Sequence, residues 1–213
     1  MIMLKMCGLG TRDDVDAAVA AGASHVGLVR FPKSPRHLKM TEAAALARHA
    51  EGAARTVVVT VDATDGEIAQ IVDEIAPDLI QLHGRESPER AAMVARRWNV
   101  GVVKALPVRE ADDLARAGDY ADAVDWLLFD AKAPEGADLP GGNGEAFDWT
   151  LLRGFEPGVR WFLAGGLHAG NVAEAVKRSG ARALDLSSGI EDAPGVKSAA
   201  RMAAVGEAVR GLT

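Results

Sequence analysis

Four polar side chains lie at or near the ends of apolar stretches, where a folded chain could expose them to a ligand: Cys7, His83, Lys104 and Asp130. A thiolate can act as a base when nearby cations or helix dipoles lower the cysteine pKa from about 8.5. A carboxyl group in a partly apolar pocket has a raised pKa and can act as a general acid. Cys7 and Asp130 are therefore a candidate base and acid. The alternatives are a small buried cysteine and an aspartate that caps its own turn.

Two lysines, Lys5 and Lys104, lie within apolar stretches. A buried lysine can form a Schiff base with a carbonyl substrate, or it can pair with a carboxylate or reach the solvent through its flexible stem. His83 could titrate near neutral pH, or be held by one backbone hydrogen bond. Asp185 alternates with apolar neighbours, and we interpret it as structural.

Two turns near the end of the chain could hold an anion. One contains Gly165 and Gly166, and the other contains Ser187, Ser188 and Gly189. Glycine lets main-chain N–H groups approach an anion closely, and such groups bind phosphate without a basic side chain. The turns follow the last two strands of an alternating strand–helix chain, where a TIM barrel places its phosphate site. The sequence therefore predicts a small phosphorylated metabolite as ligand.

Arg36 follows the second expected strand in a segment with two prolines, Pro32 and Pro35. The prolines stiffen this loop and would present the arginine in a defined direction. A guanidinium fork matches the geometry of a substrate carboxylate. A solvated surface arginine is the alternative that the residues alone leave open.

Composition excludes several classes of protein. With 213 residues, 48% of them hydrophobic and 25% charged, the chain has ample material for the core of a soluble globular protein. A net charge of -6 and a pI near 5.4 argue against a nucleic-acid surface. The single cysteine cannot form an internal disulfide, which fits a reducing compartment. Lys5 and Gly8 interrupt the N-terminal apolar stretch, and no apolar window is long enough to span a bilayer. We therefore expect a cytoplasmic protein that binds neither nucleic acid nor membrane.

Short β-branched runs alternate with longer Ala-rich amphipathic runs along the whole chain. The short runs predict strands at 4–7, 25–29, 56–61, 79–83, 101–106, 126–130, 160–164 and 183–186. The longer runs predict helices at 12–21, 41–50, 65–76, 88–98, 109–116, 148–154, 171–179 and 198–209. Eight such units in a chain of this length predict a closed (β/α)8 TIM barrel that forms a single domain over residues 1–213.

The competing architecture is an open doubly wound sheet. A G-x-G-x-x-G motif after the first strand would favour it, and the segment from Gly8 to Asp13 lacks the third glycine. One loop is also unusually long: residues 131–147 follow the sixth expected strand and are rich in proline and glycine. This loop is either a lid over the site or an irregular surface excursion, and length alone does not decide between them.

Seven segments in order along the chain together resemble the phosphoribosylanthranilate isomerase family of tryptophan biosynthesis. They are Lys5-Met6-Cys7-Gly8-Leu9, Pro32-Lys33-Ser34-Pro35-Arg36, Gln81-Leu82-His83-Gly84, Leu127-Leu128-Phe129-Asp130-Ala131, Leu139-Pro140-Gly141-Gly142-Asn143-Gly144 with Phe147-Asp148-Trp149, Leu163-Ala164-Gly165-Gly166-Leu167, and Asp185-Leu186-Ser187-Ser188-Gly189-Ile190-Glu191 followed by Pro194-Gly195 and Lys197.

The resemblance implies a TIM barrel that catalyses an Amadori rearrangement of a phosphorylated aminoaldose, with no metal and no organic cofactor. It implies that Cys7 is the general base, that Asp130 is the general acid and that Arg36 holds the anthranilate carboxylate. The two glycine-containing turns would bind the phosphate, and His83 is a further candidate for contact with the substrate. The sequence does not decide between a monomer and a homodimer. It also does not decide whether the protein has a side activity on the related aminoaldose of histidine biosynthesis.

Two other functions are compatible with these residues. A lysine-dependent aldolase, or a barrel similar to indole-glycerol-phosphate synthase, would share the fold and the phosphate site but would need Lys104 as its essential group. A barrel that senses a phosphorylated metabolite without catalysis would have no need for an acid and a base.

Overall fold

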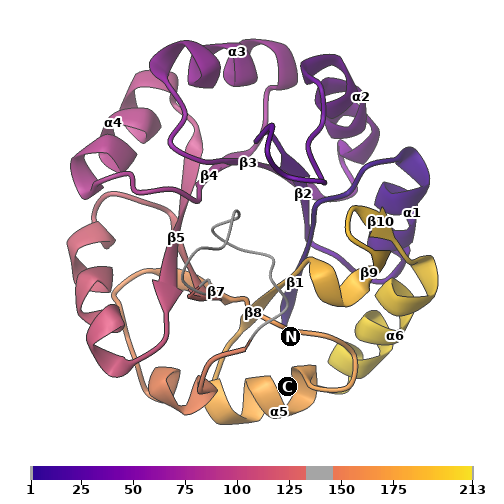
Figure 1. Cartoon of the computed structure of the whole chain (residues 1–213), viewed down its shortest axis with the longest axis vertical. Coiled ribbons are helices and arrows are strands. Elements are labelled where there is room, and N and C mark those ends of the chain that lie inside the picture. Colours follow the sequence, from indigo (N-terminus) through magenta and orange to yellow (C-terminus); the bar gives the residue numbers. More distant parts are fainter. Residues whose placement is uncertain (1, 133–145, 213) are drawn as a thin grey trace.

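The chain folds into a ring of parallel strands surrounded by helices (Figure 1). This is a computed structural model, and it describes residues 2–132 and 146–212. Its strands are β1 (Met3–Cys7), β2 (His25–Val29), β3 (Arg55–Thr60), β4 (Leu79–Leu82), β5 (Gly101–Val108), β6 (Trp126–Ala131), β7 (Arg160–Leu163) and β8 (Ala183–Leu186). Pairing of β1 with both β2 and β8 closes the barrel, which confirms the (β/α)8 fold and excludes the open sheet. Most of the long loop at residues 131–147, which the sequence left as either a lid or an irregular surface excursion, lies outside the described residues.

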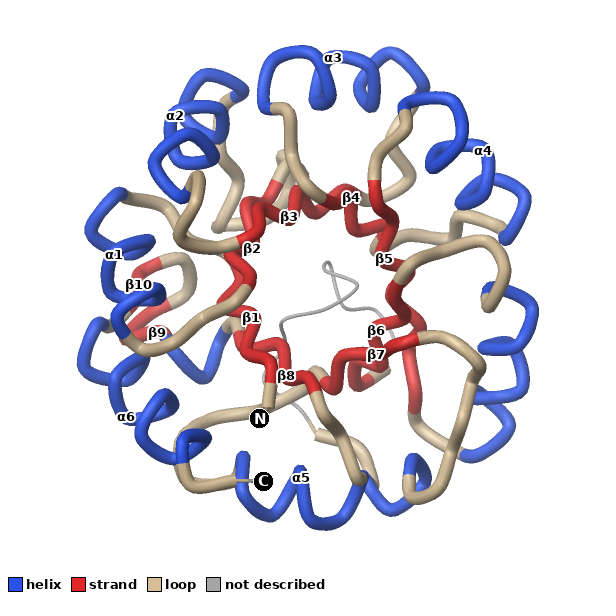
Figure 2. Tube along the Cα trace, turned by 180° about the vertical axis from the view of Figure 1, so that it is seen from behind, coloured by secondary structure: helices blue, strands red, loops and turns tan. Residues whose placement is uncertain are grey.

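The helices form the outer layer of the barrel, as the tube drawing in Figure 2 shows. They are α1 (Arg12–Ala20), α2 (Met40–Ala50), α3 (Asp65–Ile75), α4 (Pro88–Trp98), α5 (Val172–Ser179) and α6 (Ala199–Arg210). Several begin at side-chain caps: Thr11, Thr64 and Ser87 each accept a hydrogen bond from an N–H of the first turn. No helix in the described ranges is long and apolar enough to cross a membrane.

Two of the expected helices have 3₁₀ rather than α geometry. They are η1 (Ala111–Tyr120) and η2 (Trp149–Leu152). In η1 the buried side chains are Leu114, Ala117 and Tyr120, which recur every third residue. That spacing matches the three residues per turn of a 3₁₀ helix, so burial of this face favours the tighter winding.

A hairpin that the sequence analysis did not predict follows β8. After a short 3₁₀ turn, η3 (Ser188–Ile190), strands β9 (Glu191–Ala193) and β10 (Val196–Lys197) pair antiparallel. The dipeptide Pro194-Gly195 between them is a common turn signal and was the sequence cue for this hairpin. Gly195 has a positive φ of 82°, which a side chain would disfavour.

The described residues form three apolar clusters, the smallest of which contains Cys7, Val29 and Val59. A second cluster lies inside the ring and includes Val103, Trp126, Leu128 and Phe162. The largest packs the outer faces of the strands against the helices. Side chains alternate between the two faces of each strand, so every second residue points into the ring. At the C-terminal ends of the strands this inward set includes the candidate catalytic residues Cys7 and Asp130, with Val29 and Val59 packed beside Cys7.

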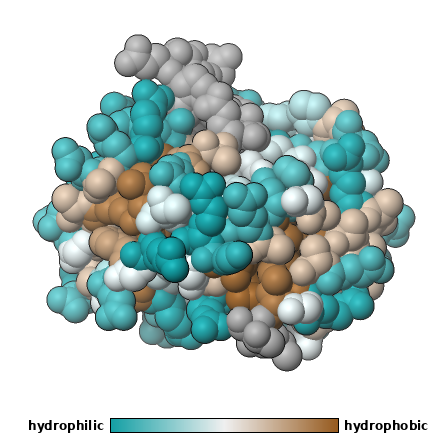
Figure 3. Space-filling view, turned by 90° about the horizontal axis from the view of Figure 1, so that it is seen from below, coloured by the Kyte–Doolittle hydropathy of each residue, from teal (hydrophilic) through white to brown (hydrophobic). Residues whose placement is uncertain are grey.

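The outer surface mixes polar and apolar residues. On the face in Figure 3, hydrophobic patches are separated by broad hydrophilic areas. Val196 is the one large hydrophobic residue classed as exposed among the described residues, at 57% of its surface. The apolar side chains of the helices are therefore mostly covered by the barrel that they surround.

The first and last helices of the described chain, α1 and α6, pack against each other. Gly206 of α6 lies against the backbone of Ala21, so closely that a Cβ at this position would overlap the carbonyl oxygen of Ala21 and come within 3.0 Å of its Cα. Backbone atoms cannot yield as a flexible side chain would. Gly206 therefore allows the last helix to dock on the first.

Gly206→Ala should lower the free energy of unfolding by about 1–3 kcal/mol, because the added methyl forces the two helices apart. The matched control is Gly66→Ala in α3, where a Cβ meets no atom closer than 4.0 Å. This second change should leave stability unaltered or raise it by up to about 1 kcal/mol through helix propensity. Urea unfolding of both variants measures the difference. Equal stability of the two variants would contradict the close-approach argument.

Candidate active site

Cys7, His83 and Asp130 all lie at the C-terminal mouth of the barrel. Cys7 ends β1, His83 follows β4 directly, and Asp130 is the penultimate residue of β6. Nε2 of His83 is 3.4 Å from Oδ2 of Asp130, and the amide nitrogen of Gln81 is 2.8 Å from the other His83 ring nitrogen. The structure thus brings the acid candidate and the histidine together.

Asp130 combines the two arrangements that the sequence left open. Its Oδ1 accepts a hydrogen bond of 2.9 Å from the N–H of Ala131, which belongs to its own turn. Its Oδ2 faces His83 instead. The side chain is mostly buried, with 11% of its surface exposed. The turn therefore orients one oxygen while the other remains directed into the mouth.

Cys7 occupies space that Gly27 leaves free on the neighbouring strand. The two residues are partners in the β1–β2 register. A Cβ at position 27 would lie 2.6 Å from Sγ of Cys7 and 2.9 Å from its Cα. Sequence reasoning missed Gly27, and a lone glycine within an apolar strand was the signal that pointed to such a close approach.

The thiol of Cys7 is buried among charged groups. Burial raises its pKa, Lys5 lowers it, Asp185 raises it and Lys197 lowers it, and the net direction is upward. Lys5 lies two residues earlier on the same face of β1, fully buried, with its Nζ 2.9 Å from Oδ1 of Asp185. Burial alone would lower the pKa of Lys5, but Asp185 and Cys7 raise it above the ordinary value. Lys5 is therefore a charged ammonium group beneath the thiol.

Arg36 is held by a carboxylate of the unpredicted hairpin. Its Nε and Nη2 donate to the two oxygens of Glu191 at 2.7 and 2.8 Å. Lys197 Nζ donates to the same carboxylate at 2.7 Å. Burial raises the pKa of Glu191, but hydrogen bonds from Arg36 and Lys197 outweigh it and hold that pKa below its usual range. This is not the solvated surface arginine that the sequence left as an alternative.

The hairpin also touches the Arg36 loop through its backbone. A Cβ on Gly195 would lie 2.7 Å from the carbonyl oxygen of Pro35, so the turn of the hairpin packs directly on this loop. Within the loop, the N–H of Arg36 donates to the Ser34 hydroxyl at 3.2 Å. The side chain of Arg36 also covers Gly8, where a Cβ would come within 2.6 Å of its Cδ. The arginine is thereby fixed next to the end of β1.

The two turns expected to bind an anion lie against each other at the mouth. Gly165 and Gly166 have positive φ angles of 87° and 62°. Gly189 approaches the turn after β7 so closely that a Cβ there would overlap the Leu167 carbonyl. Asn171, which sequence reasoning missed, donates from its side-chain amide to the carbonyl of Gly166 at 2.9 Å.

The second turn is held by Lys197, which donates to the carbonyl oxygen of Ser187 at 3.0 Å. Among the hydrogen bonds between described residues, none uses the amides of Gly165, Gly166 or Ser188 as donors. Uncommitted amides at glycine-rich turns are the groups that bind phosphate.

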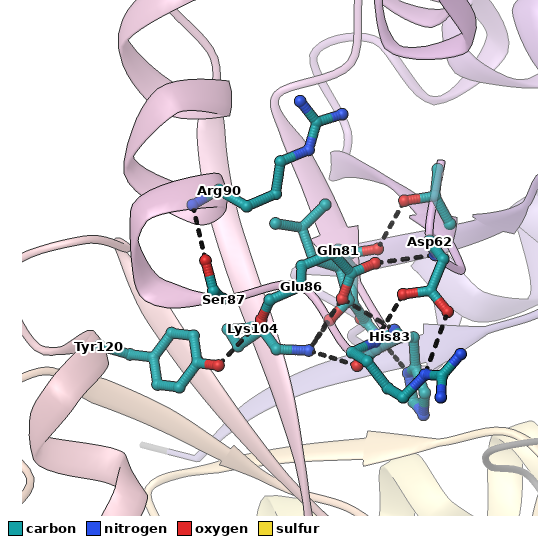
Figure 4. A network of polar contacts seen from close by, with 12 residues as sticks. Asp62, Gln81, His83, Glu86, Ser87, Arg90, Lys104 and Tyr120 are labelled. Carbon is teal, nitrogen blue, oxygen red and sulfur yellow. Dashed lines mark hydrogen bonds and ion pairs between the residues drawn. The ribbon is translucent and has the colours of Figure 1, made fainter. Parts of the chain in front are cut away.

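Lys104 does not reach the mouth. Its neighbours Val103 and Ala105 point into the ring, so Lys104 faces the outer layer. Its Nζ donates to Glu86 at 2.9 Å and to the carbonyl of Gly84 at 2.8 Å. Figure 4 shows this contact together with the hydrogen bond that the Tyr120 hydroxyl donates to the carbonyl oxygen of Glu86. Lys104 therefore fixes the segment between β4 and α4.

The chain matches the family model for N-(5'phosphoribosyl)anthranilate (PRA) isomerase over residues 4–208. It is 51% identical over 207 residues to the N-(5'-phosphoribosyl)anthranilate isomerase of Rhizobium meliloti (strain 1021), covering 97% of this chain and 96% of the relative. The structure is similar to that of phosphoribosyl anthranilate isomerase from Thermotoga maritima, with a TM-score of 0.89, 31% identity and full coverage of both chains. Another similar structure, with a TM-score of 0.86, 28% identity and full coverage, is a phosphoribosyl anthranilate isomerase in complex with reduced 1-(o-carboxyphenylamino)-1-deoxyribulose 5-phosphate.

Glu191→Gln should destabilise the fold near pH 7 by about 3–5 kcal/mol, because two buried cations lose their common counter-charge. The folded-state pKa of Glu191 is depressed, so its stabilising effect is present above the unfolded pKa and is lost as pH falls through the folded pKa. The difference from wild type should therefore shrink below about pH 4.5. Urea unfolding at neutral and acid pH measures it.

The control for this change is Glu174→Gln, since Glu174 is largely exposed and its contact with Arg178 is 3.4 Å. That variant should stay within about 0.5 kcal/mol of wild type at either pH. A Glu191→Gln penalty that does not vary with pH would show that lost hydrogen-bond acceptance, rather than lost charge, is responsible.

Proposed function

The chain belongs to the N-(5'-phosphoribosyl)anthranilate isomerase family, and we propose that Cys7 and Asp130 are the base and the acid of its reaction. The reaction converts N-(5'-phosphoribosyl)anthranilate to 1-(2-carboxyphenylamino)-1-deoxyribulose 5-phosphate. The observation that carries the proposal is the convergence of both side chains on one barrel mouth, with Arg36 and two glycine-containing turns at the same end.

The first step is opening of the sugar ring. In its acid form, Asp130 gives a proton to the furanose oxygen, the C1′–O bond breaks, and the nitrogen lone pair forms an iminium with C1′. The oxygen of Asp130 near His83 is the one available for this transfer, because the other is held by the N–H of Ala131. His83 orients that oxygen and lines the substrate site.

The second step is loss of the C2′ hydrogen, which the neighbouring iminium makes acidic. The thiolate of Cys7 takes this proton, and the C–H electron pair neutralises the iminium to give an enolamine. Tautomerisation then moves a proton from the C2′ hydroxyl to C1′ and forms the ketose amine. One acid and one base suffice, provided that the substrate is held in a fixed orientation.

The two anionic ends of the substrate supply that orientation. Glu191 takes one edge of the Arg36 fork, through Nε and Nη2, and the edge that includes Nη1 is left for the anthranilate carboxylate. The phosphate binds to the amides of the turns at Gly165, Gly166, Ser187, Ser188 and Gly189. A carboxylate site and a phosphate site at one mouth match the two ends of this substrate.

Cys7→Ser and Asp130→Asn should each lower kcat by about 10²–10⁴, because each removes one proton-transfer group. Lys104→Met is the matched control, since Lys104 lies on the outer face of the barrel. It should retain kcat in protein shown to be folded, whereas a lysine-dependent aldolase would lose all activity. Turnover of phosphoribosylanthranilate, followed as loss of its fluorescence, is the measurement. Normal turnover by both catalytic variants would refute the assignment.

Arg36→Met should raise KM for phosphoribosylanthranilate about 10–100-fold with a smaller effect on kcat, because it removes a charge-assisted contact with the carboxylate. The control is a substrate analogue in which aniline replaces anthranilate. Wild type and variant should handle this analogue with nearly equal kcat/KM. If the variant is equally impaired on both substrates, Arg36 serves the fold and does not recognise the carboxylate.

A further inference from the structure

Catalysis by Cys7 needs a thiolate, yet the thiol is buried at 7% exposure. Burial favours the neutral thiol, because a charge in a water-poor site loses its hydration. A base in this position therefore needs a counter-charge built into the fold, and the described residues around Cys7 show where that charge lies.

Lys5 is placed for this role by three features. It is two residues before Cys7 on the same strand, so both side chains point into the ring. Its side chain is fully buried and donates a hydrogen bond to Asp185. Register pairs Lys5 directly with Asp185 on β8, which holds the ammonium group at 2.9 Å.

Cys7 is also surrounded by groups from other elements of the barrel. Asp185 comes from β8, Lys197 from β10 and Arg36 from the loop after β2, while the partner residue on β2 is the uncharged Gly27. Glu191 pairs with both Arg36 and Lys197, and its single negative charge offsets one of their two positive charges. With three cations and two carboxylates, the cluster has one positive charge in excess. A thiolate at Cys7 would make it neutral.

We propose that Lys5, held by Asp185, is a positioning residue that supplies the counter-charge of the Cys7 thiolate. The inference rests on the proposed role of Cys7 as the base. It adds the residue whose positive charge stabilises the thiolate form. Lys5 thus acts through the thiol, without touching the substrate.

Lys5 and Asp185 carry opposite charges, so replacing each of them should shift the titration of Cys7 in opposite directions. Lys5→Met removes a cation and should raise the titration midpoint of Cys7 by about 1–3 pH units. Asp185→Asn removes an anion that disfavours the thiolate and should lower the midpoint. A merely structural role predicts the same direction for both variants, since each breaks the same salt bridge.

The thiolate can be followed by its ultraviolet absorbance in the intact protein. Cys7 is the only cysteine of the chain, so the signal has one source. The chain also has only one tyrosine, whose ionisation is recognised at its own longer wavelength. The acid limb of the kcat/KM profile should move with the thiol midpoint in each variant.

Lys5→Met leaves Asp185 buried without a partner. If this variant does not fold, Lys5→Met/Asp185→Asn is compared with Asp185→Asn alone, a pair that isolates the loss of the cation. The double variant should have the higher midpoint, by about 1–3 pH units. Lys5→Arg retains the charge and should restore a midpoint near that of wild type.

Lys104→Met is the matched control, because Lys104 is also a buried lysine 2.9 Å from a carboxylate but faces the outer layer. It should leave the thiol midpoint unchanged. Unchanged midpoints in the Lys5 and Asp185 variants, or shifts in the same direction, would overturn the proposal. Full activity of Cys7→Ser would instead refute the role of Cys7 as base, while the thiol titration would still report on Lys5.

Discussion

The mouth of this barrel depends on charges placed where water cannot neutralise them. Lys5 and Lys197 have fully buried side chains, and each is paired with a carboxylate that is itself nearly buried. Removing one partner of such a pair leaves an uncompensated charge in a site of low polarity, which is far less favourable than removing both. The cluster therefore resists rearrangement, and it holds Cys7 and Arg36 beside each other at the end of β1. That rigidity is what a proton transfer requires, because small displacements of the reacting groups slow it strongly.

The two sides of the mouth differ in charge. Cys7 faces Lys5 and Lys197, whereas Asp130 faces His83 and the backbone of its own turn. An acid and a base that work in one reaction must hold opposite protonation states at the same pH, and separate surroundings allow this. Cations near the thiol favour its charged form. Those cations lie on the β1 side of the mouth, whereas Asp130 lies on the β6 side next to His83.

Much of this architecture was readable in the residues, and the failures have physical causes. Strand periodicity and the glycine-rich turns predicted eight units, the barrel and the strand ends at Cys7 and Asp130. The contacts that complete the site join residues 155 and 180 positions apart, Arg36 with Glu191 and Lys5 with Asp185, and no local pattern encodes such pairs. The outward direction of Lys104 was hidden for another reason. Barrel strands are apolar on both faces, so their sequence does not say which side faces the ring. The 3₁₀ winding of η1 reflects packing rather than helix propensity.

The phosphate site proposed at the two glycine-containing turns fits the same balance of charge. A substrate with a phosphate and a carboxylate brings several negative charges to a cluster that has one positive charge in excess. If lysines bound the phosphate directly, they would be neutralised by the substrate and could no longer favour a thiolate. Main-chain amides at Gly165, Gly166 and Ser188 offer partial positive charge without any net charge. Lys197 accordingly donates to the carbonyl of Ser187 and to Glu191, and so shapes the second turn. In the proposed site, a phosphate held by these amides would leave Lys5 and Lys197 paired with their own carboxylates.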